Sequence, residues 1–263
     1  MALTLASLHI HPVKSLGGFA VGEALLTDRG LEHDRRWMLV RADGVFVSQR
    51  ELPAMALLHT APLDGGFRVT DIRDGAVLEL PWCIMEGDDV TASVWEDRVD
   101  TRAGQAAWDA WFSERLGTSL RLVHMPDASQ RPTDGRFADG ITSLSDGYPC
   151  LIISQASLDD LNARLPGSVP MDRFRPNMVI AGGYGFQEDG WRELRIGDAR
   201  FSLVKPCARC VMVTIDQRTA ERGAEPLRTL ATFRAAGNKV LFGMNAMCAA
   251  GSVVRVGDPV VPW

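Results

Sequence analysis

The chain has 263 residues, of which 46% are hydrophobic and 23% are charged, a balance that is ordinary for a globular enzyme. This length allows one large β-rich domain or two smaller ones, and either can bury an adequate core. The formal charge of −5 and the isoelectric point near 5.6 argue against a nonspecific nucleic-acid surface or a polybasic membrane surface.

The first hundred residues predict short strands separated by turns. Strands are expected at 3–13, 19–27, 67–72, 76–82, 90–96 and 98–102, with a hairpin over 36–49 that turns at Ala42-Asp43-Gly44. Turn signals at about ten-residue spacing are typical of a β-barrel or a sandwich. Residues 103–117 then change to helical spacing, and Gly117 supplies a stop. We therefore place the domain boundary at this helix.

The second part of the chain alternates strands with two helices. A strand over 120–125 leads into the polar loop 126–149, and loops of that length are usually functional lids or disordered. Further strands are expected at 150–154, 177–181, 192–204, 211–215 and 252–263, and helices near 225–236 and from Ser157, where the sequence is close to a capping box. The predicted fold class is mainly β with a few helices.

Cysteine usage and the absence of targeting signals predict the location of the protein. The five cysteines are an odd number scattered over a long chain, which indicates reduced thiols. No apolar stretch approaches the roughly 18 residues of a transmembrane helix, and the N-terminus shows no signal-peptide pattern. A cytoplasmic protein without a membrane association is expected.

The segment KPCARC at 205–210 carries the strongest chemical signal. Cys207 and Cys210 lie three positions apart, with Lys205 and Arg209 beside them. Thiolates are the soft ligands that transition metals prefer, and flanking cations favour the ionised thiol. The chain has no second CxxC and its histidines are distant, so a four-ligand zinc site is hard to assemble. The motif predicts a single-cysteine anchor for a group that the chain recruits.

Three polar clusters interrupt the apolar strands. Lys14 and Ser15 could present a charge and a hydroxyl to an anion, although an ordinary turn at a strand end explains them equally well. Arg35 begins a strong strand, where a surface ion pair is the plainer interpretation. The proline after Arg175 predicts an extended backbone there, and Asn177 begins a buried strand. An arginine and an amide at such a strand end would suit an anionic heterocycle.

Neither the histidines nor the common hydrolase and nucleotide-binding motifs indicate a function for this chain. His9 and His11 alternate along one strand and so face the same side, but no third metal ligand lies near them in the sequence. No GxSxG, no Walker A loop and no GxGxxG after a strand is present. Hydrolase, nucleoside-triphosphate and dinucleotide-binding functions therefore have no motif support.

Taken together, these clusters resemble a known family. The chain contains, in order, HPVKS, DRRW, SDGYPCLIISQASLDDLNARL, RFRPNMVI, PCARCVMVTID and VGDPV. This series resembles the MOSC (molybdenum-cofactor sulfurase C-terminal) domain with its N-terminal β-barrel, in the arrangement of the mitochondrial amidoxime-reducing component and of bacterial reductases of N-hydroxylated base analogues. The resemblance implies a smaller MOSC-associated β-barrel domain over 1–102 and a β-barrel MOSC domain over 103–263. The first strand and Lys14 would contribute to a shared cofactor cleft.

The resemblance also implies a molybdenum cofactor (Mo-molybdopterin), with no pyridoxal phosphate. In those relatives the second cysteine of the motif ligates the metal, which implies Cys210 here as metal ligand and catalytic residue. Arg35 is preferred to Arg36 for the cofactor because it directly follows the aspartate. The implied cofactor-binding residues are Lys14, Ser15, Arg35, Ser145, Asp146, Arg175, Asn177, Ala208 and Arg209. The implied reaction converts N–OH to N–H, and the cofactor carries the redox chemistry.

Departures from the family pattern leave the electron source open. Ala208 stands where some relatives carry serine, no cluster-type cysteine spacing is present, and the membrane anchor of the mitochondrial forms is missing. We therefore expect a small N-hydroxylated substrate, a separate ferredoxin-like or flavin-reductase-like electron donor, and no nucleic-acid or membrane partner.

Two other functions stay open at this point. One is a molybdenum-cofactor carrier or a protein that transfers sulfur as a persulfide on Cys207 or Cys210. The other is a thiol redox module in which these cysteines form a disulfide. The apolar strand expected after Cys210 argues against the redox module, because such motifs usually begin a helix.

Overall fold

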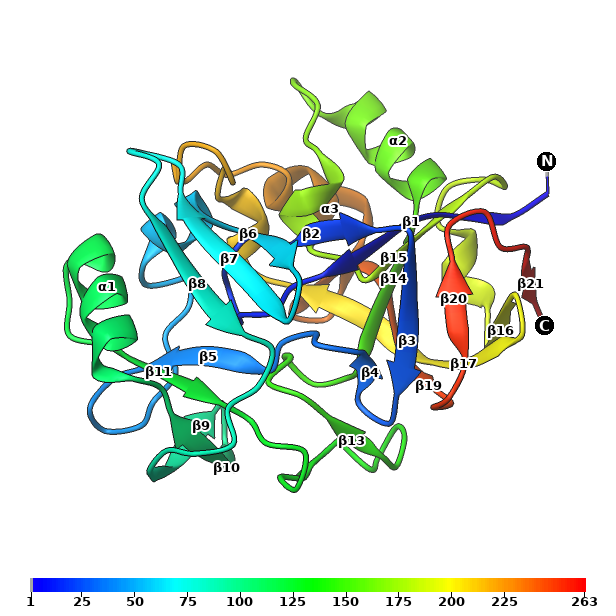
Figure 1. Ribbon diagram of the computed structural model, residues 1–263. Helices are drawn as coiled ribbons and strands as arrows, with labels where there is room; N and C mark the ends of the chain where they lie inside the picture. Colours follow the sequence, from blue (N-terminus) through cyan, green and yellow to red (C-terminus); the bar gives the residue numbers. More distant parts are fainter. Residues whose placement is uncertain (1) are drawn as a thin grey trace.

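A nine-stranded sheet joins strands from both ends of the chain in the computed structural model, which describes residues 2–263. In sheet order the strands are β2 (Phe19–Val21), β1 (Thr4–Ile10), β15 (Met178–Ala181), β14 (Cys150–Ser154), β19 (Lys239–Cys248), β17 (Ala199–Arg209), β16 (Glu193–Ile196) and β21 (Val260–Pro262), with β18 (Ala235–Ala236) beside β19. β1 pairs antiparallel with β15, and β15 pairs in parallel with β14. The N-terminal strand therefore lies within a sheet whose other long strands come from the second half (Figure 1).

The centre of this sheet is fully buried, which explains its continuous apolar sequence. All five residues of β14 are buried, as expected for a strand covered on both faces. One face packs residues such as Leu8, Ile180 and Phe201 into a single core cluster. The other face packs Ile153 against helix α2 (Gln155–Arg164) and Phe174 against Phe242.

A second β-rich region is formed by residues 37–124. It contains β5 (Trp37–Val40), β11 (Arg121–His124), β10 (Asp97–Ala103) and β9 (Asp89–Val94) in one sheet, and β6 (Leu58–Leu63), β7 (Gly66–Asp71) and β8 (Val77–Pro81) in another. Helix α1 (Ala106–Leu116) lies against β11 (Figure 1) and buries Trp108 and Phe112 with Trp37. It ends at Gly117, whose φ of 68° suits a left-handed helix cap.

Short elements complete the fold. They are β3 (Glu23–Thr27), β4 (Gly30–Leu31), β20 (Val253–Arg255), β12 (Arg131–Pro132), β13 (Ile141–Thr142), α3 (Leu227–Phe233) and the 3-10 helices η1 (Pro53–Leu57), η2 (Met171–Phe174), η3 (Gln187–Gly190) and η4 (Val211–Thr214). Within residues 2–263 strands predominate and three α-helices are present. The predicted fold class is confirmed.

The structure corrects one predicted element beside the cysteine motif and adds a strand that was not predicted. Residues 211–215 were expected as a strand, but Val211–Thr214 form η4 because β17 already continues to Arg209 and the chain turns at Cys210. The partner that extends β17 is β19, which the sequence did not predict because Gly243, with a φ of 79°, interrupts its apolar run.

The start of α2 is also earlier than predicted. Ser157 is inside the helix, and Ser154 is its N-cap, with its hydroxyl accepting a hydrogen bond from the Ser157 amide at 3.0 Å. Glu188, which is buried, accepts hydrogen bonds from the hydroxyls of Ser154 at 2.9 Å and Ser157 at 2.7 Å. These two serines therefore fix the helix start through a distant carboxylate.

Candidate functional site

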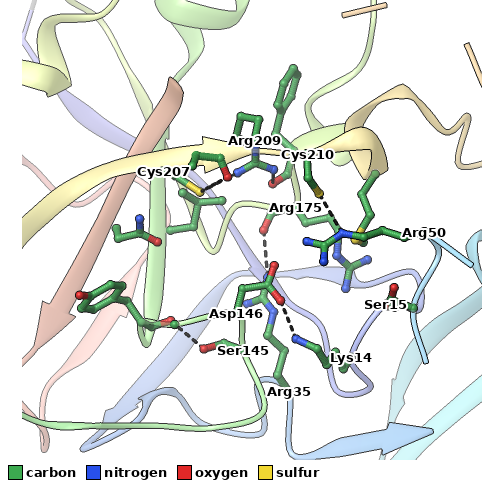
Figure 2. Close-up of a pocket in the computed structure, with 18 of the residues that line it drawn as sticks. Lys14, Ser15, Arg35, Arg50, Ser145, Asp146, Arg175, Cys207, Arg209 and Cys210 are labelled. Carbon is green, nitrogen blue, oxygen red and sulfur yellow. Dashed lines mark hydrogen bonds and ion pairs between the residues drawn. The ribbon is translucent and has the colours of Figure 1, made fainter. Parts of the chain in front are cut away.

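A cavity of about 100 Å³ lies between the two halves of the chain. Its walls come from the loop after β1, the segment before β5, the corner before β14, the residues before β15 and the end of β17. Every residue predicted for the site lines it: Lys14, Ser15, Arg35, Ser145, Asp146, Arg175, Asn177, Ala208, Arg209 and Cys210. Figure 2 shows the cysteines on one side of this cavity and Lys14 and Asp146 on the other.

The two cysteine sulfurs are held by different arginines. Arg50 Nε donates to Cys210 Sγ at 3.2 Å, and Arg209 Nη1 donates to Cys207 Sγ at 3.1 Å. Arg209 also donates to the Phe174 carbonyl at 2.8 Å, which fixes its position. Among residues 2–263, no group of three His, Cys, Asp or Glu side chains could hold a metal ion. A metal at Cys210 would therefore need most of its ligands from a recruited group.

Lys14 and Asp146 form an ion pair across the cavity. Lys14 Nζ lies 2.7 Å from Asp146 Oδ1, and the Lys14 side chain is 6% exposed. Burial lowers the pKa of Lys14 to about 8, although Asp146 opposes this shift. Burial also acts to raise the pKa of Asp146, but the Lys14 ammonium outweighs it and holds that pKa well below its usual range. Lys14 is thus a buried cation whose pKa lies only slightly above neutral pH.

Arg35 rather than Arg36 faces the cavity, as predicted. Arg35 Nη1 donates to Asn177 Oδ1 at 3.1 Å and its Nη2 donates to the Arg175 carbonyl at 3.1 Å. Asp34, buried beside it, forms an ion pair with the same guanidinium. Arg36 turns away and pairs with Asp127 at 2.8 Å. Arg35 therefore links two elements that line the cavity.

Arg175 does not have the extended backbone that the following proline predicts. Its φ of 53° and ψ of 47° are left-handed, a conformation stabilised here by hydrogen bonds from its amide to the Asp172 carbonyl and from Arg35 to its own carbonyl. The side chain is buried and donates to the Leu16 carbonyl. Its Nη2 has no hydrogen-bond partner among the described residues. Burial, with the neighbouring charge of Arg35, lowers the pKa of Arg175 to about 9.

The cavity lining carries more positive than negative charge. Its cations are Lys14, Arg35, Arg50, Arg173, Arg175 and Arg209. Asp146 supplies the carboxylate in the described lining, and Arg35 and Arg173 pair with carboxylates outside it. Arg175 has an unmet donor and no carboxylate partner in the part of the chain described. Such a cavity favours an anionic ligand.

Some predicted site residues have side chains that the protein already engages. The Ser145 hydroxyl donates to the Tyr148 carbonyl at 2.8 Å. Asn177 Oδ1 accepts from the Leu151 amide at 3.1 Å as well as from Arg35. Ser15 has a φ of 69° and its carbonyl accepts from Gln49 at 2.7 Å. Their geometry is suited to holding the cavity walls in place.

The long loop 126–149 is tethered at several points. Buried Arg131 donates to the carbonyls of Ser143 at 3.1 Å and Ser145 at 2.5 Å. Arg29 donates to the carbonyl of Ser129 at 3.0 Å. The hydrogen bonds of Arg131 therefore hold in place the end of the loop at Ser145 and Asp146, which line the cavity.

Five residues of the cavity wall lie outside the motifs that the sequence singled out: Phe46, Ser48, Arg50, Trp95 and Asn245. Arg50, for example, lies 160 positions from Cys210. A position in or beside an expected strand, which is the sequence signal of most of them, cannot distinguish them from surface residues.

Comparisons with known proteins agree with this architecture. The MOSC domain family model matches residues 139–261, and the MOSC N-terminal beta barrel domain matches residues 2–119. Mitochondrial amidoxime-reducing component 1 of Mus musculus is 32% identical over 285 residues, covering 98% of this chain and 81% of the mouse protein. The Homo sapiens protein of that name is 33% identical over 98% of this chain and 82% of its own length.

The chain belongs to the MOSC-domain family, in the form that begins with a MOSC N-terminal β-barrel domain. A molybdenum cofactor sulfurase of Oryza sativa subsp. japonica is also 32% identical over 98% of this chain, but the match spans only 35% of that larger protein. The domain boundary expected near residue 103 stays a prediction. Within residues 2–263 no helix is both long enough and apolar enough to cross a lipid bilayer.

Proposed function

We propose that this protein is a molybdenum-cofactor-dependent enzyme that reduces N-hydroxylated compounds from N–OH to N–H. The observation that carries the proposal is one cavity that combines the soft ligand Cys210 with an excess of cations, of which Lys14 and Arg175 are buried. The near full-length similarity to amidoxime-reducing components supports the same conclusion.

The residues present fit an anionic cofactor that brings its own metal ligands. Cys210 supplies one thiolate, a ligand type that molybdenum and other soft metals accept. Arg175 has a buried donor without a partner, and a buried unmet donor costs free energy that a phosphate oxygen would recover. Lys14 and Arg35 complete a cationic wall next to it. We assign these three residues to the anionic part of the cofactor.

When bound, the cofactor would supply the two-electron couple that removes oxygen from the N–OH group, which consumes two protons and releases water. The chain's own residues then bind and orient. Arg209 donates to Cys207 Sγ and Arg50 donates to Cys210 Sγ, so the choice of Cys210 as metal ligand rests on its place as the second cysteine of the motif. The electrons would come from a separate donor protein of the ferredoxin or flavin-reductase type, and the cytoplasmic location stays a prediction.

A cofactor carrier or persulfide-transfer protein is the second candidate, because the sulfurase of Oryza sativa is equally similar over this chain. Cys207 and Cys210 are both free thiols, as sulfur transfer requires. The sequence argument against the third possibility, a disulfide redox module, does not hold, because η4 and not a strand follows Cys210. The geometry disfavours it for another reason, since separate arginines hold the two sulfurs.

The deciding experiment uses protein from a host that makes the molybdenum cofactor. We expect molybdenum and pterin in near-equal amounts to protein, and turnover of benzamidoxime with reduced methyl viologen as electron source. Cys210→Ser should lose the metal and the activity, whereas the matched variant Cys207→Ser should keep the metal. Full metal content without turnover would favour the carrier, and metal loss in Cys207→Ser alone would reverse the ligand assignment.

A further inference from the structure

The contacts of Arg50 differ from those of Lys14, Arg35 and Arg175, the residues assigned to the anionic part of the cofactor. Its Nε donates to Cys210 Sγ at 3.2 Å, and its guanidinium carbon lies 4.2 Å from the centre of the Trp95 ring. Within residues 2–263 its Nη1 and Nη2 atoms have no hydrogen-bond partner, and no carboxylate pairs with it. Arg50 therefore presents free donors beside the sulfur of Cys210 (Figure 2).

The other cations are more deeply buried, paired with a carboxylate or, in the case of Arg209, already donating to Cys207 Sγ and to the Phe174 carbonyl. Lys14 and Arg175 are 5% and 8% exposed, so they lie at the buried end. Arg173 pairs with Asp216 at 2.7 Å. Arg50 is only half-buried, and its neighbour Trp95 is 44% exposed. The cavity thus has a buried cationic end and an open end where Arg50 and Trp95 meet solvent.

Aromatic packing supports the Arg50 guanidinium, whose carbon lies over the Trp95 ring. Trp95 lies edge-on to Phe46, with ring centroids 4.8 Å apart. Trp95 also has a φ of 58°, which is unfavourable for a bulky residue and is typically retained only where surrounding structure or function demands it. A guanidinium held on an aromatic face, with its Nη groups free, is preorganised to bind a carboxylate through two hydrogen bonds.

We propose that Arg50 and Trp95 form a subsite that recognises an anionic substituent of the substrate, and that the preferred substrates are small, planar N-hydroxylated compounds carrying a carboxylate. This inference rests on the proposed function. The contact between Arg50 and Cys210 places the bound carboxylate next to the residue assigned to the metal, so the N–OH group and the carboxylate belong to one compact molecule. The Trp95 ring supports the Arg50 guanidinium in this position.

Binding measurements on the cofactor-loaded protein test the subsite without turnover. Benzoate and benzamide are matched planar probes that differ in charge, and we expect benzoate to bind about tenfold more tightly, the effect of one charge-assisted hydrogen bond. Arg50→Gln should abolish that preference, and Arg50→Lys should retain part of it. The control is Arg218→Gln, which removes the same charge from an exposed residue outside the cavity lining and should leave the preference intact.

Turnover provides the second readout. The ratio of kcat/KM for 3-carboxybenzamidoxime to that for benzamidoxime should fall about tenfold in Arg50→Gln and stay at the wild-type value in Arg218→Gln. An equal loss for both substrates, or an unchanged benzoate preference, would overturn the subsite. Loss of molybdenum from Arg50→Gln would overturn it too, by making Arg50 a cofactor ligand. If the wild-type protein turns over neither substrate yet still prefers benzoate, the proposed function fails while the anion subsite stands.

Discussion

Replacing Arg175 with methionine should separate cofactor binding from folding stability. Arg175 is buried, has an unmet Nη2 donor and lacks a carboxylate partner among residues 2–263. Its buried charge therefore destabilises the cofactor-free fold, and it stabilises the complex once an anion is bound. Methionine keeps a long flexible side chain that can fill the same space without charge.

The magnitude follows from the electrostatics of the site. The fall in the pKa of Arg175 to about 9 corresponds to a penalty on the charged form of the order of 5 kcal/mol. Losing the hydrogen bond to the Leu16 carbonyl should cost about 1–3 kcal/mol of the stability gained by removing that charge. We expect the cofactor-free variant to be more stable by about 2–4 kcal/mol, a rise in Tm of at least about 4 °C.

The dependence on pH has a defined sign. The folded-state pKa of Arg175 is lowered, so at neutral pH the residue is charged in both the folded and the unfolded state and the penalty is complete. As pH rises through about 9, the folded wild-type protein releases the proton and regains stability. The advantage of Arg175→Met should therefore persist below that pH and shrink above it.

The assay compares cofactor-free and cofactor-loaded proteins by thermal unfolding and by molybdenum content. Arg175→Met should retain the cofactor about tenfold to a hundredfold less well. The matched control is Arg173→Met, which removes the partner of Asp216 and should lower the cofactor-free Tm instead. A cofactor-free Tm of Arg175→Met below wild type, with normal molybdenum content, would refute the reasoning and make Arg175 a structural arginine.

Three further outcomes are expected. Because burial lowers the pKa of Lys14 to about 8, cofactor retention after dialysis should fall between about pH 7 and pH 9, and a flat retention profile would contradict this role. The cofactor-free fold should gain stability as pH rises from about 8 toward 10.5, the ordinary pKa of lysine. Gly18→Ala would place its Cβ 2.2 Å from Nδ1 of His11, so urea unfolding should show a loss of about 2–3 kcal/mol, whereas Gly22→Ala, with nothing within 4 Å, should change little. Glu188→Gln should lose about 1–3 kcal/mol in thermal unfolding, because this buried carboxylate accepts one amide and two hydroxyl hydrogen bonds; an unchanged Tm would show that the amide replaces it.

The sequence predicted those parts of the site that lie in recognisable motifs. HPVKS, DRRW, RFRPN and PCARC each place polar residues at the end of a strand, and the strand ends meet at one cavity. Arg35 was preferred to Arg36 because it directly follows the aspartate, and Arg35 is the one that lines the cavity. Motif position therefore brought these residues to one cavity, whereas their roles toward a cofactor stay a prediction.

The failures have tertiary causes. The left-handed backbone of Arg175 depends on Arg35, which donates to its carbonyl, and this contact overrides the local preference before proline. The turn at Val211–Thr214 depends on pairing of β17 with β19. Arg50 reaches the cavity through contacts with Trp95 and Cys210, residues far from it in the sequence. No local pattern contains that information.

The position of β1 inside the main sheet constrains how the protein is made. β1 is synthesised before every other strand of this sheet, and its partner β15 is encoded more than 160 residues later, as the pairing of Leu8 with Met178 shows. Until then β1 has an unpaired edge, and contacts of such long sequence separation form slowly. The cavity closes later still, because its lining includes Asn245 on β19. A nascent chain therefore cannot offer the complete cavity to a ligand before β19 has been synthesised, which places ligand loading late in translation or after it.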